Sequence, residues 1–245
     1  MTEPVDKWPQ GAKILVILAH PDDPEFFLGG TIASWTQSGY EVQYALLTKG
    51  ERGISAAFPD CAQLLEVRMV EQRAAADVLG VTRVDFFDYP DGYLVPDLDV
   101  RREVTKLIRK VKPDIVVSCD PQNYYLSDTS LNHPDHRAAG QIVVDAVFPA
   151  VGNRSFFPEL AEEGFPVTMI SELWLSLPFA PTVEMDVSDC WGRRIEALLQ
   201  HHSQIGDPDA FKKHLEDHRA KSNGSGGRYI ERFRRIVFRR QDESF

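Results

Sequence analysis

The sequence has little cysteine, no long apolar run and no excess of positive charge, and each shortage excludes a class of protein. The three cysteines stand far apart, so they form neither a disulfide framework nor a CxxC metal clip. No stretch approaches the ~20 consecutive apolar residues that span a membrane. The net charge of −10, from 27 Lys and Arg against 37 Asp and Glu, disfavours nucleic acid as a partner. We therefore expect a cytoplasmic protein without a membrane span.

Signals for export and for nucleotide binding are also missing. The opening residues, MTEPVDKWPQGAK, have no apolar core behind a positive start, so no secretory signal peptide is expected. No GxGxxG or GxxxxGK[ST] follows any apolar run, so a nucleotide cofactor has no support. What the chain does have is 245 residues, of which 43% are hydrophobic, enough to bury one sizeable core.

Short apolar runs alternate with amphipathic segments from the start of the chain. Buried parallel strands are predicted at residues 14–19, 42–48, 84–88 and 115–119. Helices are predicted between them at residues 25–38, 64–79 and 98–111, followed by one from residue 134 to about 147. This order predicts the α/β class, a single Rossmann-like domain with a mostly parallel sheet flanked by helices.

The pattern weakens beyond residue 150. A further strand is expected at residues 173–177, a helix at residues 189–200 and a flexible loop at residues 221–227. The basic run at residues 232–240 is interleaved with apolar residues, which is typical of a terminal strand or helix with a solvated charged face. No internal repeat and no linker divides the chain.

Ionisable residues follow the predicted strands. The first strand runs into His20-Pro21-Asp22-Asp23, and the loop after the fourth leads to His133-Pro134-Asp135-His136. Ligands of open parallel α/β sheets bind outside the carboxyl ends of the strands, so both clusters should lie at one edge of the sheet. The sequence thus predicts a single site there.

The residue types in the two clusters indicate metal chemistry. In the first cluster, an imidazole and one carboxylate can point at a single ion while the other carboxylate faces a water molecule. In the second, Pro134 suits the first helical position, which puts His133 at the cap and His136 about one turn in. Two histidines and one carboxylate are a common ligand set for catalytic zinc. The alternative is that the aspartates and His133 only cap helices. Two such clusters at one edge of the sheet favour the metal site over this alternative.

The segments AHPDDPEFFLGGTIA (residues 19–33) and HPDHR (residues 133–137) closely resemble the PIG-L/LmbE-like family of zinc-dependent deacetylases. The family includes N-acetylglucosaminyl deacetylases. The TKGE turn at residues 48–51, the helix around Arg68 and the HHSQ element at residues 201–204 also resemble family features. The resemblance covers about residues 12–205, so we expect one domain over residues 1–245 with a C-terminal extension at about 206–245.

The resemblance implies a role for each matching residue. His20, Asp23 and His136 would bind one Zn²⁺ per chain, and Asp22 would be the general base. His133 would stabilise the oxyanion or protonate the leaving amine, as an imidazolium whose ring Asp135 holds. Arg68 would contact the substrate, and Glu25 would support the site from behind. The family likeness also makes a homo-oligomer plausible.

The expected activity is hydrolysis of an N-acylated small molecule, most simply removal of acetyl from an N-acetylglucosamine-type sugar or conjugate. Two alternatives stay open: a zinc amidase on a thiol conjugate or other acylated metabolite, and a non-catalytic metal-binding module. A base at Asp22 speaks against the last, because a pure binding site does not need one. The loop at residues 121–132 and the segment at residues 152–168 are expected to shape the substrate pocket.

Overall fold

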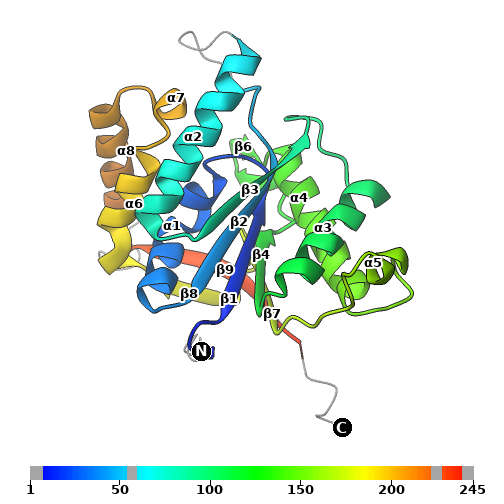
Figure 1. Cartoon of the computed structure of the whole chain (residues 1–245). Helices are drawn as coiled ribbons and strands as arrows, with labels where there is room; N and C mark the ends of the chain where they lie inside the picture. The colour runs from blue at the N-terminus through cyan, green and yellow to red at the C-terminus, as the bar shows by residue number, and fades with distance from the viewer. Residues whose placement is uncertain (1–7, 54–59, 222–227, 239–245) are drawn as a thin grey trace.

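Seven strands form the central sheet, in the spatial order β3-β2-β1-β4-β7-β9-β8 (Figure 1). The computed structural model describes residues 8–53, 60–221 and 228–238. Five strands run parallel: β1 (Lys13–Leu18), β2 (Glu41–Thr48), β3 (Arg83–Tyr89), β4 (Ile115–Cys119) and β7 (Glu172–Ser176). β9 (Ile230–Val237) is antiparallel to β7 and to β8 (Val183–Asp186). The predicted α/β class with a mostly parallel sheet is confirmed.

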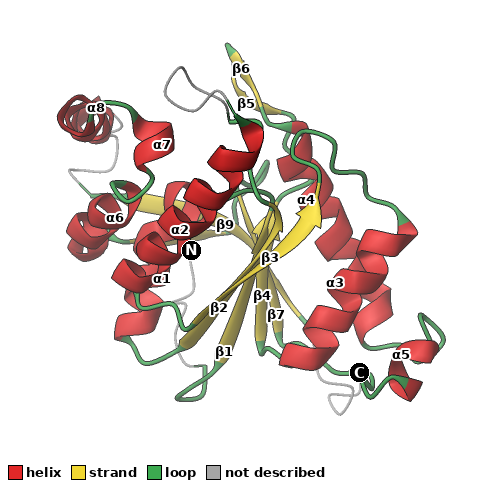
Figure 2. Cartoon of the chain, turned by 45° about the horizontal axis from the view of Figure 1, so that its top comes forward, coloured by secondary structure: helices red, strands yellow, loops and turns green. Residues whose placement is uncertain are grey.

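Helices cover both faces of the sheet (Figure 2). One layer contains α1 (Asp23–Gln37), α2 (Cys61–Leu79) and α6 (Trp191–Leu198); the other contains α3 (Leu98–Val111) and α4 (Pro134–Asp145). In the described residues no helix is long and apolar enough to cross a membrane. The shorter elements are the hairpin β5 (Tyr125–Ser127) and β6 (Ser130–Leu131), η1 (Ala146–Val151), α5 (Glu159–Glu162), η2 (Ser188–Cys190), α7 (His202–Ile205) and α8 (Pro208–Lys221).

Strand β1 shows how the sequence builds the two layers. Successive side chains of a strand point to opposite faces of a sheet. Ile14 and Val16 therefore pack against the α1 and α2 side, whereas Leu15 and Ile17 pack against the α3 and α4 side. Because both faces are covered, the strand is a continuous apolar run without the alternation of a half-exposed strand.

Local signals set the ends of the predicted helices. In α3, Val100, Val104 and Ile108 repeat every four residues and are buried against the sheet. The Asp97 side chain caps its N-terminus by accepting from two backbone N–H groups. Most of the predicted loop at residues 221–227 lies outside the described residues.

A buried carboxylate from the C-terminal part of the chain divides α1 in two. The backbone leaves the helical conformation at Leu28, and the N–H groups of Gly30 and Thr31 donate to Glu231 of β9 at 3.0 and 2.7 Å. Glu231 therefore caps the second half of α1. A Cβ on Gly30 would lie 2.6 Å from Val187, so only glycine allows this close approach. The sequence motifs end near residue 205. The part of the chain beyond them nevertheless belongs to the same sheet, because β9 is one of its internal strands.

The irregular segment after α4 is organised around one buried arginine. Arg109 of α3 is 1% exposed, and its guanidinium has no carboxylate within hydrogen-bonding distance among the described residues. It donates instead to backbone carbonyl groups, at 2.9 Å to Ala150 and 3.0 Å to Phe156, and at 3.3–3.5 Å to Val151, Asn153, Phe157 and Phe165. Arg109 thus links α3 to residues 150–165, where four of the six contacted carbonyl groups also accept a backbone N–H.

We predict that Arg109→Met lowers the free energy of unfolding by about 3 kcal/mol, because six carbonyl groups lose a hydrogen bond worth up to about 1 kcal/mol each. Arg102 lies on the same helix and pairs with Glu159 at the surface. Arg102→Met is the matched control and should cost far less. Urea unfolding of both variants tests this, and equal losses would contradict the role given to Arg109.

Candidate metal centre and active site

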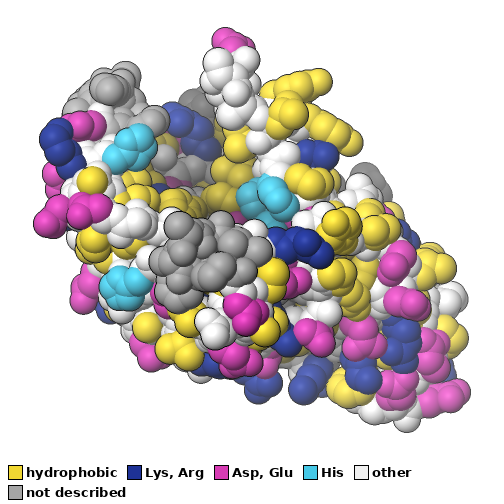
Figure 3. Space-filling model, turned by 90° about the horizontal axis from the view of Figure 1, so that it is seen from above, with side chains coloured by type: hydrophobic (Ala, Val, Ile, Leu, Met, Phe, Trp, Pro, Cys, Tyr) yellow, Lys and Arg dark blue, Asp and Glu magenta, His cyan; other side chains and the backbone are white. Residues whose placement is uncertain are grey.

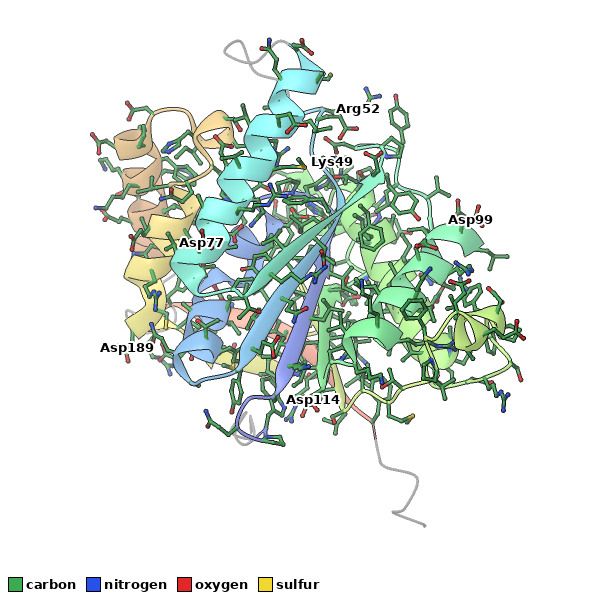
Figure 4. All side chains as sticks on the ribbon, viewed as in Figure 1. Lys49, Arg52, Asp77, Asp99, Asp114 and Asp189 are labelled. Atoms are coloured by element: carbon green, nitrogen blue, oxygen red, sulfur yellow. The ribbon has the colours of Figure 1, made fainter. Side chains whose placement is uncertain are left out.

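The loops after β1 and β3 and the start of α4 meet at the carboxyl edge of the sheet, at the top of Figure 1. In Figure 4, Lys49 and Arg52 mark this edge and Asp114 marks the opposite one. Figure 3 looks onto the same edge and shows a histidine side chain at the surface, among hydrophobic side chains and those of Lys or Arg. The structure brings the two predicted clusters together here.

His20, Asp23 and His136 form a compact group. Asp23 lies between the two imidazoles, with Oδ2 3.4 Å from His20 Nδ1 and Oδ1 3.1 Å from His136 Nε2. His133 joins them, because ring nitrogens of the three histidines all lie within 4.8 Å of one another. Burial acts to raise the pKa of Asp23, but His136 and His20 outweigh it and hold that pKa well below its usual range. An ionised carboxylate facing two imidazole nitrogens suits a divalent metal ion.

Hydrogen bonds on the far side of each ring fit the same interpretation. His136 Nδ1 pairs with Asn132 Oδ1 at 2.9 Å, which leaves Nε2 for the site. His20 Nε2 lies 3.1 Å from Asp91 and 3.3 Å from Asp135, which leaves Nδ1 toward Asp23. Histidines that bind metals generally donate their other N–H in this way, because it fixes the tautomer and the ring orientation. The donor set and its surroundings thus fit a bound metal.

Asp22 stands beside this group in an unusual conformation. Its φ of 93° lies in the left-handed region, which non-glycine residues rarely adopt. Arg68 Nη2 donates to its Oδ2 at 3.0 Å. Burial raises the pKa of Asp22 to about 6, although the charge of Arg68 acts to lower it. A carboxyl group with such a pKa can both accept and release a proton near neutral pH.

His133 is the N-cap of α4 with Pro134 in the first turn, as the sequence predicted. The backbone N–H of Asp135 donates to its Nδ1 at 3.2 Å, so in the neutral ring the proton sits on Nε2. Burial lowers the pKa of His133, and His20 and His136 lower it further. A neutral ring with its proton on Nε2 fits this contact, and the imidazolium that the resemblance implies stays a prediction.

The predicted partner of Asp135 is also wrong. Its carboxylate does not hold the ring of His133; it lies against His20 and accepts from the N–H groups of Gly92 and Leu94 at 2.7 and 3.2 Å. The backbone explains this, because Asp135 sits in the first turn of α4 and points toward the loop after β3. Asp135 thus supports a candidate metal ligand.

Arg68 lies under the turn that follows β2. It is 4% exposed and donates to the carbonyl oxygens of Gly50 and Pro21 as well as to Asp22. A Cβ on Gly50 would lie 2.3 Å from the guanidinium, and φ of Gly50 is 68°, so this position needs glycine. The contacts present show Arg68 holding Asp22; contact with a substrate stays a prediction.

A cavity of about 400 Å³ opens over the cluster. Its lining consists of His20, Arg52, Gly53, Arg68, Asp91, Gly92, His133 and His136. Neither segment expected to shape the pocket contributes to this lining. Residues 151–154 and 168 instead line a separate cavity beside η1, and the hairpin β5–β6 projects from the molecule (Figure 2). That expectation is therefore wrong for the cavity over the histidines.

Sequence reasoning missed three buried residues that support the site, Asp91, Asn132 and Gln72, and it assigned no role to His201 of the HHSQ element. Asp91 had a signal, since it follows the third strand in the run DYPDG. Gln72 had a weaker one, because it lies one helical turn after Arg68 and shares its face. Asn132 gave none beyond standing next to HPDHR.

Comparisons with known proteins agree with this geometry. The model of the PIG-L family, described as GlcNAc-PI de-N-acetylase, matches residues 15–147. Diacetylchitobiose deacetylase of Thermococcus kodakarensis is 34% identical over 194 residues, which cover 79% of this chain and 70% of that protein. The solved structure of N,N'-diacetylchitobiose deacetylase from Pyrococcus horikoshii has a TM-score of 0.82 and 30% identity, over 92% of this chain and 84% of the other.

One relative carries out a different reaction. 4-Oxalmesaconate hydratase of Pseudomonas putida is 35% identical over 118 residues, which cover 45% of each chain. The relatives of this chain therefore include an enzyme named for the addition of water as well as enzymes named for deacetylation.

We predict that His136→Ala weakens metal binding by more than the roughly 100-fold that loss of a supporting partner costs, because it removes a ligand. Asp22→Asn should retain the metal, since Asp22 is not among the proposed ligands. Metal analysis after dialysis separates the two variants. A metal-free Asp22→Asn protein would contradict the assignment of Asp22.

Asp135→Asn tests which histidine Asp135 serves. Removing the negative charge beside His20 should weaken metal affinity about 10- to 100-fold. Competition with a chelator measures it, with Asp128→Asn on the exposed hairpin turn as control. Unchanged affinity would mean that the contact with His20 has no bearing on the metal.

Proposed function

This chain belongs to the PIG-L family, and from that premise we propose that it removes the acetyl group from an N-acetylglucosamine-type sugar or conjugate with one zinc ion per chain. It is a deacetylase, an enzyme that hydrolyses amide bonds. The observation that carries the proposal is the position of Asp22, a carboxylate with a raised pKa, directly beside His20, Asp23 and His136.

The three candidate ligands support zinc as the ion. Two imidazole nitrogens and one carboxylate are a frequent set at catalytic zinc, which keeps a further position open. A zinc ion bound there would supply a Lewis acid and a water molecule of lowered pKa. The chain's own contribution is to fix the two ring orientations through Asn132, Asp91 and Asp135.

Asp22 and His133 divide the remaining tasks. Asp22, held by Arg68, accepts a proton from the attacking water. His133 presents Nε2–H, which can donate a hydrogen bond to the oxygen on which charge develops. A neutral imidazole cannot give this proton away without becoming an anion. The proton that the departing amine needs is therefore the one that Asp22 has taken up.

The cavity supports a small polar substrate. Its volume of about 400 Å³ falls within the range of small-molecule sites, roughly 300–1,000 Å³. Apart from two glycines, its lining residues are His, Arg and Asp, whose polar groups can bind the hydroxyl groups of a sugar. Arg52 at the rim lies 4.6 Å from the ring centroid of Tyr93, an exposed aromatic side chain of the kind that can pack against a sugar ring.

We also infer that the whole chain acts as one domain in the cytoplasm. β9 is an internal strand, and Glu231 on it caps α1, so the C-terminal part belongs to the same folded unit. The three cysteines are unpaired, which agrees with a reducing compartment. Whether copies of the chain assemble is tested by sedimentation velocity.

We predict that the zinc-loaded protein releases acetate from diacetylchitobiose or N-acetylglucosamine, and that a chelator abolishes this release. Asp22→Asn should lower kcat by about 10²- to 10⁴-fold, because it removes the base. Acetate release is measured across a panel of N-acetyl sugars, N-acyl thiol conjugates and unsaturated dicarboxylates.

The panel separates the alternatives. Release only from thiol conjugates would identify the amidase, and addition of water to a double bond without acetate release would identify a hydratase. A zinc-loaded protein inactive on every compound would favour the metal-binding module and contradict the proposal.

A further inference from the structure

Behind Asp22 lies a chain of buried polar groups that reaches the C-terminal part of the molecule. The backbone N–H of Asp22 donates to Gln72 Oε1 at 2.7 Å. Gln72 Nε2 donates to both carboxylate oxygens of Glu25, at 3.0 and 3.1 Å. Glu25 Oε2 pairs with His201 Nε2 at 3.1 Å. The side chains of Gln72, Glu25 and His201 are fully buried, so water does not compete for these bonds.

The order of donors and acceptors along this chain fixes the orientation of Gln72. A carboxylate only accepts hydrogen bonds, so the amide nitrogen of Gln72 must face Glu25. Its oxygen then faces the N–H of Asp22. If Glu25 moved away, the amide could rotate and present a second donor to the N–H of Asp22. His201 pairs with Glu25 on the other side and thereby maintains the order of donors and acceptors along this series of hydrogen bonds.

This N–H belongs to the residue with a φ of 93°. For a residue with a Cβ, the left-handed region is unfavourable relative to ordinary helical backbone. Surrounding contacts must therefore hold it. Gln72 is bonded to the backbone of Asp22, whereas Arg68, one turn earlier in α2, is bonded to its side chain. The two together determine where the Asp22 carboxylate points.

Separate bonds hold the segment that carries His201. Ser203 donates from its N–H and its Oγ to Glu71, at 2.8 and 2.7 Å. Gln204 Nε2 donates to the carbonyl of Gly53. Consecutive residues of α2, Glu71 and Gln72, thus face the C-terminal segment and the Asp22 turn respectively.

We propose that Gln72 is a positioning residue, oriented by Glu25 and His201, which holds the Asp22 backbone in the left-handed conformation that aims its carboxylate at the attacking water. The proposal rests on the proposed role of Asp22 as base. It gives the His201 segment an effect on turnover that acts through Glu25 and Gln72, although no residue of that segment lines the cavity over the histidines.

The central test compares Gln72→Met with Gln43→Met. Methionine keeps the length of glutamine but neither accepts from Asp22 nor donates to Glu25. Gln43 bonds Glu41 near the opposite end of β2, so its substitution removes a similar Gln–Glu bond away from the site. Gln72→Met should lower kcat about 10- to 100-fold, the scale expected for a misplaced catalytic group, with KM and metal affinity within about twofold of wild type. Gln43→Met should leave all three unchanged.

His201 supplies a rescue experiment, which also serves if Gln72→Met does not fold. His201→Gln retains a donor for Glu25 and should keep most of kcat, whereas His201→Met should lose as much as Gln72→Met. The double variant Gln72→Met/His201→Met should be no slower than Gln72→Met alone, because both changes break one chain. Equal losses in His201→Gln and His201→Met would indicate packing alone and overturn the proposal.

Hydrogen exchange of the Asp22 amide in metal-free protein gives a readout independent of activity. It should be protected in wild type and in Gln43→Met, and exchange at least about tenfold faster in Gln72→Met, which has lost its acceptor. Unchanged exchange, or unchanged kcat, in Gln72→Met would overturn the proposal. An inactive wild type, or a fully active Asp22→Asn, would instead refute the proposed function, so the two failures are distinguishable.

Discussion

Negative charge concentrated at one edge of the sheet is the constraint that the surrounding structure must meet. Asp23, Glu25, Asp91 and Asp135 are almost fully buried there, and Asp22 lies beside them. Burying a carboxylate costs several kcal/mol unless it is paired and hydrogen-bonded. Each one has partners: imidazoles for Asp23, Asp91 and Asp135, the Gln72 amide and His201 for Glu25, and Arg68 for Asp22. A chain with a net charge of −10 thus places its cationic and N–H groups where they offset this burial.

The C-terminal part of the chain also supplies partners for buried carboxylates near the site. His201 pairs with Glu25, and Ser203 donates to Glu71. Farther along, Glu231 on β9 caps the second half of α1, the helix whose first turn contains Asp23 and Glu25. The helix that carries the site is therefore held at its kink by one C-terminal residue and at its first turn by another. A chain lacking these residues would leave the Glu25 carboxylate buried without one of its partners.

The sequence was sufficient where a local pattern decides the structure. The apolar runs of β1 and β4, the periodic face of α3 and the Pro134 start of α4 each depend on neighbouring residues, and all were predicted. The edge of the sheet that carries the site followed from strand order alone. β8 and β9 were not paired in advance, because β9 alternates charged and apolar residues and its neighbours are set by contacts between distant residues.

The errors at the site have the same physical origin. Asp135 was assigned to His133, its neighbour in sequence, but the start of α4 turns its carboxylate toward His20, 115 residues away. Burial and two nearby imidazoles lower the pKa of His133, and the contact of Gln72 with Asp22 depends on the backbone conformation at Asp22; neither can be read from spacing. Spacing along a chain can name the groups that meet at a site. It cannot say which nitrogen faces which oxygen, and that detail determines the roles.

That detail also bears on which reaction the cluster performs. Adding water to a double bond and hydrolysing an amide both need an activated water molecule and a base. Each also needs a proton delivered, to the second carbon in hydration and to the departing nitrogen in amide hydrolysis. In the proposed reaction the Asp135 N–H is directed at His133 Nδ1, and Asp22, whose pKa burial raises to about 6, is the group that we propose returns the proton it has accepted. The carboxylate must then reach two positions in turn, first the water and later the nitrogen, from one fixed backbone. Under the proposed mechanism, the hydrogen bonds that Asp22 makes with Arg68 and Gln72 therefore have to hold it precisely.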